Sequence, residues 1–143
     1  MNKYEEMKKR HSEEFNTFPI KFAFSDKQFE RGMAELGLTP DDTDKVYKTP
    51  GGGFYRKEDS PRLKEMLDRH DKELKDAISA DKSGDGFIYE MFYYELNNHE
   101  YSYTQSFEDT LDALGYTYVD LERDPRLKHG ILKAAKKIDR EEE

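Results

Sequence analysis

The feature that most constrains the fold is a long apolar stripe at helical spacing in the middle of the chain. Ser60 and Pro61 form a cap and first-turn pair, which opens a helix predicted over residues 61–80. The stripe residues recur three and four positions apart, so they share one helix face and need a core to cover them. They are Leu63, Met66, Leu67, His70, Leu74, Ala77 and Ile78.

The same spacing predicts further helices on both sides of this one. Ser25 is a suitable N-cap for a helix that ends at Gly37, and Gly115 is a suitable end for another, because glycine accepts the left-handed conformation of a helix terminus. Besides residues 61–80, we predict helices over 3–16, 25–37, 88–96, 106–115, 118–121 and 125–138, with a strand or a turn at 101–104.

Short strands are predicted at three places. Phe22 and Phe24 alternate with Lys21 and Ala23, which is the two-residue period of a strand. Two further aromatic segments flank a Pro-Gly-Gly-Gly loop, so they should form a hairpin. These segments are residues 46–48 and 54–56.

Length and composition fit one folded domain. The 143 residues can bury roughly two thirds of their unfolded surface. Only 34% of residues are hydrophobic and 39% are charged, but nine Phe and ten Tyr bring large apolar areas to a core. We therefore predict a single α+β domain over residues 1–143, predominantly helical, with five to seven short helices around a small two- or three-stranded antiparallel sheet or hairpin. Helix 3–16 and the charged tail 139–143 are the segments that could lie at its periphery.

The charge balance narrows the classes of partner. With 32 Asp and Glu against 24 Lys and Arg, the net charge is −8. Nucleic-acid binding by phosphate neutralisation requires an excess of Lys and Arg on one face, so direct nucleic-acid binding is not expected. A protein partner with a basic surface fits better. A net charge that only maintains solubility is the alternative.

Cysteine usage and hydropathy exclude several kinds of site and of membrane segment. The chain has no cysteine, which excludes a disulfide framework, a thiol nucleophile and a thiolate metal site. No apolar run approaches the roughly 20 residues that a membrane span requires, and residues 1–10 lack the apolar core of a signal peptide. We expect a cytoplasmic protein that does not enter a membrane.

Residues 81–92 follow the first two thirds of an EF-hand calcium loop. Oxygen side chains stand at loop positions one, three and five, and a glycine stands at position six. Position twelve, where a bidentate Glu should close the site, is Phe92. The pattern is typical of a plain connector in which Asp85 caps the next helix, and weak calcium binding is the alternative. The predicted ligands are Asp81, Ser83, Asp85 and Glu90; no other cofactor is expected.

Two further patterns are weaker indications of chemistry. Glu95 and His99 are four residues apart and would share a helix face, which suits an edge of a metal site, an acid–base pair or an ordinary surface contact. The glycines 51–53 lack the Lys-Ser/Thr ending of a phosphate-binding loop. No nucleophile motif is present, so no catalytic residue is assigned and a metal-dependent hydrolase is the third hypothesis.

Exposed aromatic residues are the candidates for contacts with a protein partner. Tyrosine is suited to interfaces because it offers a large rigid contact area at low entropy cost. The candidates lie near the predicted hairpin and on the helix that follows the 81–86 loop. They are Tyr47, Phe54, Tyr55, Tyr93 and Tyr94.

Several segments spread over nearly the whole chain form a recognisable set. They are Phe-Ala-Phe-Ser-x-Lys-Gln-Phe (22–29), Asp-Thr-Asp-Lys (42–45), Gly-Gly-Phe-Tyr-Arg-Lys (52–57), Gly-Phe-Ile-Tyr-x-Met-Phe-x-Tyr-Glu-Leu (86–96), Asn-His-Glu-Tyr (98–101) and Thr-Leu-Asp-Ala-Leu-Gly (110–115). With them the chain resembles a family of small uncharacterised proteins from Firmicutes genomes, prophages and other mobile elements. The resemblance implies no catalytic or binding residues.

The resemblance does imply a class of partner. Small acidic proteins of phages and mobile elements often act by binding a host protein, including the nucleases of defence systems. The leading hypothesis is therefore a non-catalytic acidic protein that binds a host or phage protein and inhibits a nucleic-acid effector such as a CRISPR nuclease. A weak calcium-binding module is the second hypothesis.

Overall fold

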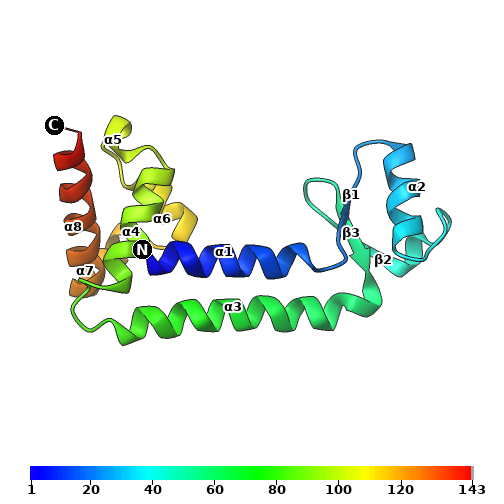
Figure 1. Cartoon of the computed structure of the whole chain (residues 1–143), viewed down its shortest axis with the longest axis horizontal. Helices are drawn as coiled ribbons and strands as arrows, with labels where there is room; N and C mark the ends of the chain where they lie inside the picture. The colour runs from blue at the N-terminus through cyan, green and yellow to red at the C-terminus, as the bar shows by residue number, and fades with distance from the viewer. Residues whose placement is uncertain (143) are drawn as a thin grey trace. The chain divides into compact units, whose positions relative to one another are not determined.

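The computed structural model describes residues 1–142, which contain eight α-helices and three short strands (Figure 1). The elements are α1 (Lys3–Asn16), β1 (Lys21–Phe22), α2 (Asp26–Glu35), β2 (Val46–Thr49), β3 (Gly53–Arg56), α3 (Ser60–Ala80), α4 (Phe87–Asn98), α5 (Tyr101–Thr104), α6 (Glu108–Leu114), α7 (Tyr118–Arg123) and α8 (Pro125–Glu141), with 3₁₀ turns at Thr43–Lys45 and Lys57–Asp59. The predicted class, α+β and predominantly helical with a small antiparallel sheet, is confirmed.

One detail of the prediction is wrong. Residues 101–104 form a helical turn, α5, where a strand or a turn was expected, and this turn is the eighth helix of the described residues. Glu100 and Gln105 adopt left-handed backbone conformations on either side of this turn, with φ of 57° and 55°. Neither is a glycine, so the sequence carries none of the usual signals for these breaks.

Several helix ends follow the predicted capping chemistry, but Ser60 does not: it has a helical backbone conformation and is itself the first residue of α3. Ser25 Oγ accepts the N–H of Gln28 (3.2 Å) at the start of α2, and Gly37 lies past its end with φ of 77°. Gly115 closes α6 with φ of 76°. Asp124 Oδ1 accepts the N–H of Arg126 (3.0 Å) and so caps α8. These interactions satisfy backbone groups that have no partner inside a helix.

The chain divides into two compact units. One takes residues 1–10 and 72–142 and is called the helical unit; the other takes residues 11–71 and is called the sheet unit. Helices α1 and α3 each contribute residues to both. No helix within residues 1–142 combines the length and the apolar character needed to cross a membrane.

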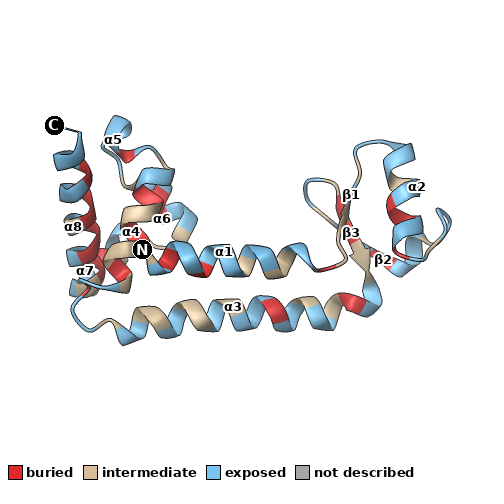
Figure 2. Ribbon diagram, viewed as in Figure 1, coloured by how far each residue is buried: buried red, intermediate tan, exposed pale blue. Residues whose placement is uncertain are grey.

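The core of the helical unit is built on α4 and α8, which pack against each other along their lengths (Figures 1 and 2). Gly130 permits this approach, because a Cβ there would lie 2.6 Å from the Ile88 side chain. Tyr4 of α1 is 4% exposed and belongs to the same core, so the start of α1 is not peripheral. Of the charged tail, residues 139–142 are exposed and residue 143 lies outside the described residues.

The sheet unit has a smaller core between α2 and the antiparallel sheet. The strand order is β1-β3-β2, so β3 lies in the middle and β1 and β2 form the edges. Phe54 of β3 packs against α2, where Gly32 leaves room for its ring: a Cβ at Gly32 would lie 2.6 Å from the ring. The buried hydrophobic residues of this cluster are Met33, Leu36, Val46 and Phe54.

Candidate functional site

The glycine-rich loop of the sheet unit lies directly against the segment that contains β1. A Cβ on Gly52 would lie 2.9 Å from the carbonyl oxygen of Ala23 and 3.1 Å from the Phe24 ring, and a Cβ on Gly53 would lie 3.1 Å from the Phe22 ring. Gly52 also has a positive φ of 85°, which disfavours any side chain. The glycines therefore allow the two Phe rings to lie on the loop backbone.

Both rings remain accessible to solvent. Phe24 is 79% exposed and Phe22 is 54% exposed, and Tyr47 on the opposite edge strand is 46% exposed. We call these three residues the aromatic surface. Phe22 lies on β1, Phe24 lies two residues beyond it and Tyr47 lies on β2, so these exposed side chains are candidates for contacts with a partner.

Two hollows flank the Phe24 ring. The larger, about 360 Å³, lies between the glycine loop and the first turn of α2, with Phe29 and Lys48 in its wall. The smaller, about 250 Å³, lies between β1 and α2. An exposed ring between two hollows offers a partner both an apolar platform and places for its own side chains.

The three aromatic residues predicted as contacts near the hairpin differ in how far they are exposed. Tyr47 is exposed and lies beside Tyr55, with ring centroids 5.9 Å apart. Tyr55 is half-buried against Phe18. Phe54 is only 2% exposed and forms the core under α2, so it supports the aromatic surface from below and does not reach solvent.

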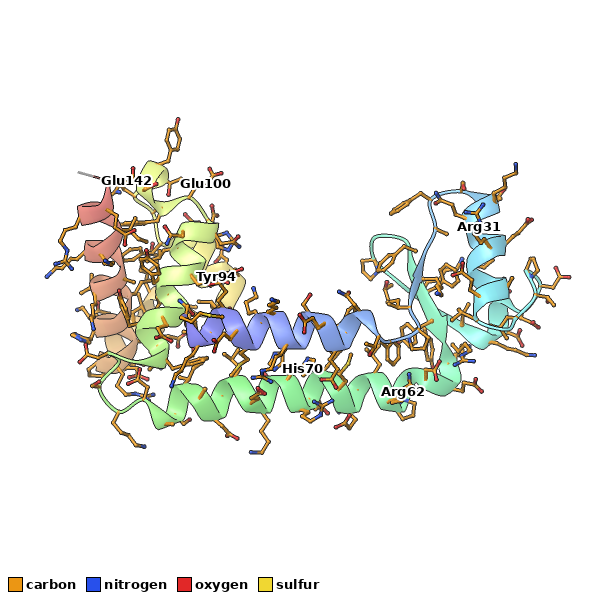
Figure 3. The ribbon with its side chains drawn as sticks, in the orientation of Figure 1. Arg31, Arg62, His70, Tyr94, Glu100 and Glu142 are labelled. Atoms are coloured by element: carbon orange, nitrogen blue, oxygen red, sulfur yellow. The ribbon has the colours of Figure 1, made fainter. Side chains whose placement is uncertain are left out.

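The other two predicted contact residues belong to the helical unit. Both Tyr93 and Tyr94 on α4 are half-buried. The Tyr93 hydroxyl donates a hydrogen bond to Glu141 Oε1 (2.7 Å). The Tyr94 ring lies against the Tyr4 ring, with centroids 5.7 Å apart. Both side chains thus already have partners inside this unit (Figure 3 labels Tyr94).

Asp81 organises the loop that resembles a calcium site. Its carboxylate accepts three backbone N–H groups, from Gly84 (2.9 Å), Gly86 (3.1 Å) and Ile88 (3.0 Å). Partial burial disfavours the charged carboxylate, but these donors, with that of Ile88 foremost, outweigh it and lower the pKa of Asp81. Because Ile88 lies in the first turn of α4, Asp81 caps this helix; the connector model had assigned that role to Asp85.

The remaining predicted ligands also have partners within the protein. Asp85 Oδ1 lies 2.6 Å from His129 Nε2 and 3.3 Å from Lys133 Nζ, and both groups lower the pKa of Asp85. Ser83 Oγ accepts the N–H of Asp85, and Glu90 accepts the N–H of Lys3 (2.8 Å) at the start of α1. Within residues 1–142, no group of three or more His, Asp or Glu side chains is arranged to hold a metal ion.

Glu95 and His99 are brought together, but in a buried network of the helical unit. Glu95 is 2% exposed, and its Oε1 accepts hydrogen bonds from the Tyr4 hydroxyl (3.2 Å) and from Lys8 Nζ (3.2 Å). His99 Nε2 lies 3.5 Å from Glu95 Oε2. Burial, followed by the charge of Glu95, raises the pKa of Tyr4. These contacts fasten the start of α1 to α4.

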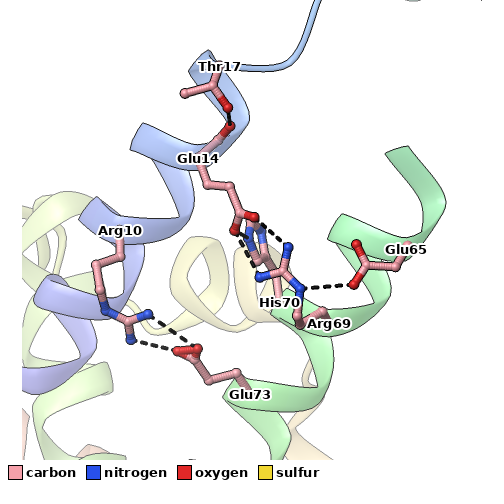
Figure 4. Close-up of polar contacts among 7 residues, drawn as sticks. All are labelled: Arg10, Glu14, Thr17, Glu65, Arg69, His70 and Glu73. Carbon is pink, nitrogen blue, oxygen red and sulfur yellow. Dashed lines mark hydrogen bonds and ion pairs between the residues drawn. The ribbon is translucent and has the colours of Figure 1, made fainter. Parts of the chain in front are cut away.

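A second charged network connects α1 and α3 inside the sheet unit (Figure 4). The Arg69 guanidinium binds both carboxylate oxygens of Glu14, and His70 Nε2 lies 2.7 Å from Glu14 Oε1. Arg69 first and His70 second lower the pKa of Glu14 to about 2. The His70 ring stacks on His11 with centroids 3.9 Å apart. The histidine on the apolar stripe therefore serves helix packing.

With this geometry established, the family of the chain can be assigned. Residues 3–137 match the model of DUF7659, a family of unknown function. The chain belongs to this family. No curated protein and no solved structure shows a significant match to it. The matched DUF7659 region includes the aromatic surface, the 81–92 loop and the Glu95 network. Membership of an uncharacterised family is confirmed, while an origin in Firmicutes or mobile elements stays a prediction.

The sequence contained a signal for the aromatic surface that the prediction of contact residues did not use. Phe22 and Phe24 alternate as they would in a strand, yet their neighbours Lys21 and Ala23 do not form a polar face. The nearby triple glycine was interpreted only as the loop of a hairpin, although glycine in this setting also permits another backbone to come close. What approaches the loop could not be deduced, because the pairing of β1 with β3 joins residues more than 30 positions apart.

Proposed function

We propose that this DUF7659 protein is a non-catalytic binding protein of a phage or other mobile element, which docks on a host or phage protein through the aromatic surface. One observation carries the proposal: Phe22 and Phe24 are 54% and 79% exposed while their rings rest on glycine backbone. Burying such rings at an interface contributes roughly 25 cal/mol for each Å² removed from water.

The class of partner follows from charge and from the resemblance to mobile-element proteins. A net charge of −8 favours a partner with a basic surface, and nucleic-acid effectors of defence systems have such surfaces. Inhibition of an effector such as a CRISPR nuclease is therefore the specific form of the proposal. It requires only stoichiometric binding.

The test is affinity capture with matched variants. Tagged wild-type protein, the double variant Phe22→Ser/Phe24→Ser and the control Leu67→Ser are each incubated with a bacterial host lysate and with purified CRISPR nucleases. Leu67 is a suitable control because it is 48% exposed and lies in the same unit, on α3.

We expect the wild type and Leu67→Ser to retain the same protein and the double variant to lose it. A retained nuclease should be inhibited at one-to-one stoichiometry in a plasmid cleavage assay. Equal retention by all three proteins, or by none, would contradict docking through the aromatic surface.

A further inference from the structure

The smaller hollow is a groove between a strand edge and a helix. Its β1 side is formed by Lys21, Phe22 and Phe24, and its α2 side is formed by residues that recur at helical spacing. The α2 residues are Gln28, Arg31, Gly32 and Glu35. Grooves of this kind accept extended peptides, which add a strand to the sheet and place alternate side chains in the groove.

The backbone of β1 faces this groove with groups that the sheet does not use. The Ala23 N–H donates to Gly52 O (3.0 Å), so Ala23 points its backbone groups toward β3. In an antiparallel pair the residues on either side then point theirs outward. The register Phe22↔Gly53 accordingly leaves the N–H and C=O of Phe22 on the outer edge.

The Gln28 side chain already bonds to the outer edge of β1, where a further strand would pair. The Phe24 N–H, two residues beyond Phe22, also points outward and donates to Gln28 Oε1 (2.7 Å). The Gln28 amide oxygen thus occupies the place that a backbone carbonyl of an added strand would take. The unsatisfied pair on Phe22 lies next to it along the same edge.

The charges of the groove, unlike the net charge of the whole chain, favour an acidic segment of the partner. Lys21 Nζ is paired with Glu35 Oε2 at 2.9 Å, so these two charges compensate each other. Arg31 is exposed, and its guanidinium has no ion pair within residues 1–142 (labelled in Figure 3). One positive charge in a fork geometry suited to carboxylates therefore remains on the groove wall.

We propose that an extended segment of the protein partner binds in this groove as an added strand along β1. Its backbone hydrogen-bonds to Phe22, an acidic side chain or terminal carboxylate binds Arg31, and an apolar side chain covers the Phe24 ring. The inference rests on the proposed function and specifies the part of the partner that is recognised.

The experiment uses a phage-displayed library of random ten-residue peptides, selected on the full-length wild-type protein. Binding of the selected peptide is measured by fluorescence polarisation to the wild type, to Arg31→Ala and to Lys27→Ala. Lys27 lies on the same helix but outside the groove, so it controls for charge. The peptide is also synthesised with a single N-methyl group at each position in turn.

We expect enrichment of peptides that carry an acidic residue, a tenfold or greater loss of affinity in Arg31→Ala, and less than a twofold change in Lys27→Ala. N-methylation should abolish binding only at the position whose N–H faces the Phe22 C=O, because β1 is two residues long and the Phe24 N–H is already bonded to Gln28.

Several results would overturn the inference. They are no enrichment, a loss spread evenly over N-methylated positions, or an affinity indifferent to Arg31→Ala. A dimer in sedimentation that Phe22→Pro abolishes would assign the edge to a second copy of the chain instead. Partner capture that depends on Phe22 and Phe24 would still stand in each case, so failure of the proposed function is detected separately.

Discussion

The two units differ in how completely they bury their phenylalanine residues. In the helical unit, α4 and α8 enclose a core of thirteen buried residues, and Phe92 is fully buried. In the sheet unit, only four residues form the corresponding cluster, and Phe22 and Phe24 remain exposed. The same residue type therefore serves stability in one unit and is available for binding in the other.

The reason lies in the number of covered faces. Two long helices that pack side by side can surround their shared apolar stripes, whereas a three-stranded sheet with a single helix, α2, has one face covered by it. Side chains alternate across a strand, so Phe54 falls on the covered face and Phe22, which pairs one position further along, falls on the other. Exposed aromatic residues in this unit follow from its architecture.

The largest effect is expected from emptying the core of the helical unit. Phe92→Ala should lower the free energy of unfolding by about 3–5 kcal/mol, because it removes a fully buried ring and leaves a cavity. Urea denaturation followed by circular dichroism measures the change, and hydrogen exchange should show lost protection in α4 and α8. A loss below about 1 kcal/mol would show that this core is not packed as described.

The next effect tests the close approach of β1 to the glycine loop. Gly52→Ala should destabilise the protein by about 1–3 kcal/mol, because a Cβ would meet Ala23 O at 2.9 Å and the backbone has φ of 85°. Gly51→Ala is the matched control, since Gly51 has φ of 83° but no atom within 4 Å of a Cβ. Thermal melts of both variants should place Gly52→Ala lower; equal melting temperatures would contradict the contact.

A smaller effect is expected at the loop of the helical unit. Asp81→Ala should cost about 0.5–2 kcal/mol at pH 7, because α4 loses its cap. The folded-state pKa of Asp81 is lowered, so its stabilisation is complete above the unfolded value near 3.9 and is lost as pH falls through the folded value. Urea denaturation at pH 7 and at successively lower pH below 4 should therefore show the difference between wild type and variant shrinking.

The same loop permits a direct test of calcium binding. An ion bound to the native state would raise the melting temperature of the wild type in millimolar calcium relative to EDTA, and this rise would disappear in Asp81→Ala. We expect no rise, because the Asp81 carboxylate already accepts three backbone N–H groups and Asp85 is paired with His129. A rise of several degrees would restore the calcium hypothesis.

The smallest effect on stability should come from the aromatic surface itself. Phe22→Ser/Phe24→Ser should change the free energy of unfolding by no more than about 0.5 kcal/mol for each residue, because exposed side chains contribute little to folding. Chemical denaturation of the Phe22→Ser/Phe24→Ser double variant measures this change. A large loss of stability would mean that the two rings belong to the core of the sheet unit, and the contrast between the units would fail.

Local patterns in the sequence were sufficient to predict most helices and strands, but not the roles of their side chains. Helix 3–16, the helix after Ser25 and the hairpin around the glycines were predicted from spacing and turn residues, because these depend on neighbours in sequence. The α5 turn was missed because Glu100 and Gln105 adopt left-handed conformations without a glycine. Asp81 was predicted as a calcium ligand because sequence spacing alone does not distinguish a carboxylate that binds an ion from one that binds backbone N–H groups.

The sequence by itself determined the α+β class, several helix ends and a hairpin around a glycine-rich loop. Only the tertiary structure decided that β1 pairs with β3 and not with β2. It also decided that Phe22 and Phe24 lie on the loop and that Phe54 lies beneath α2. Helix periodicity and turns are set by interactions within a few residues. Strand pairing and burial are set by contacts between distant residues, and these exist only once the chain has folded.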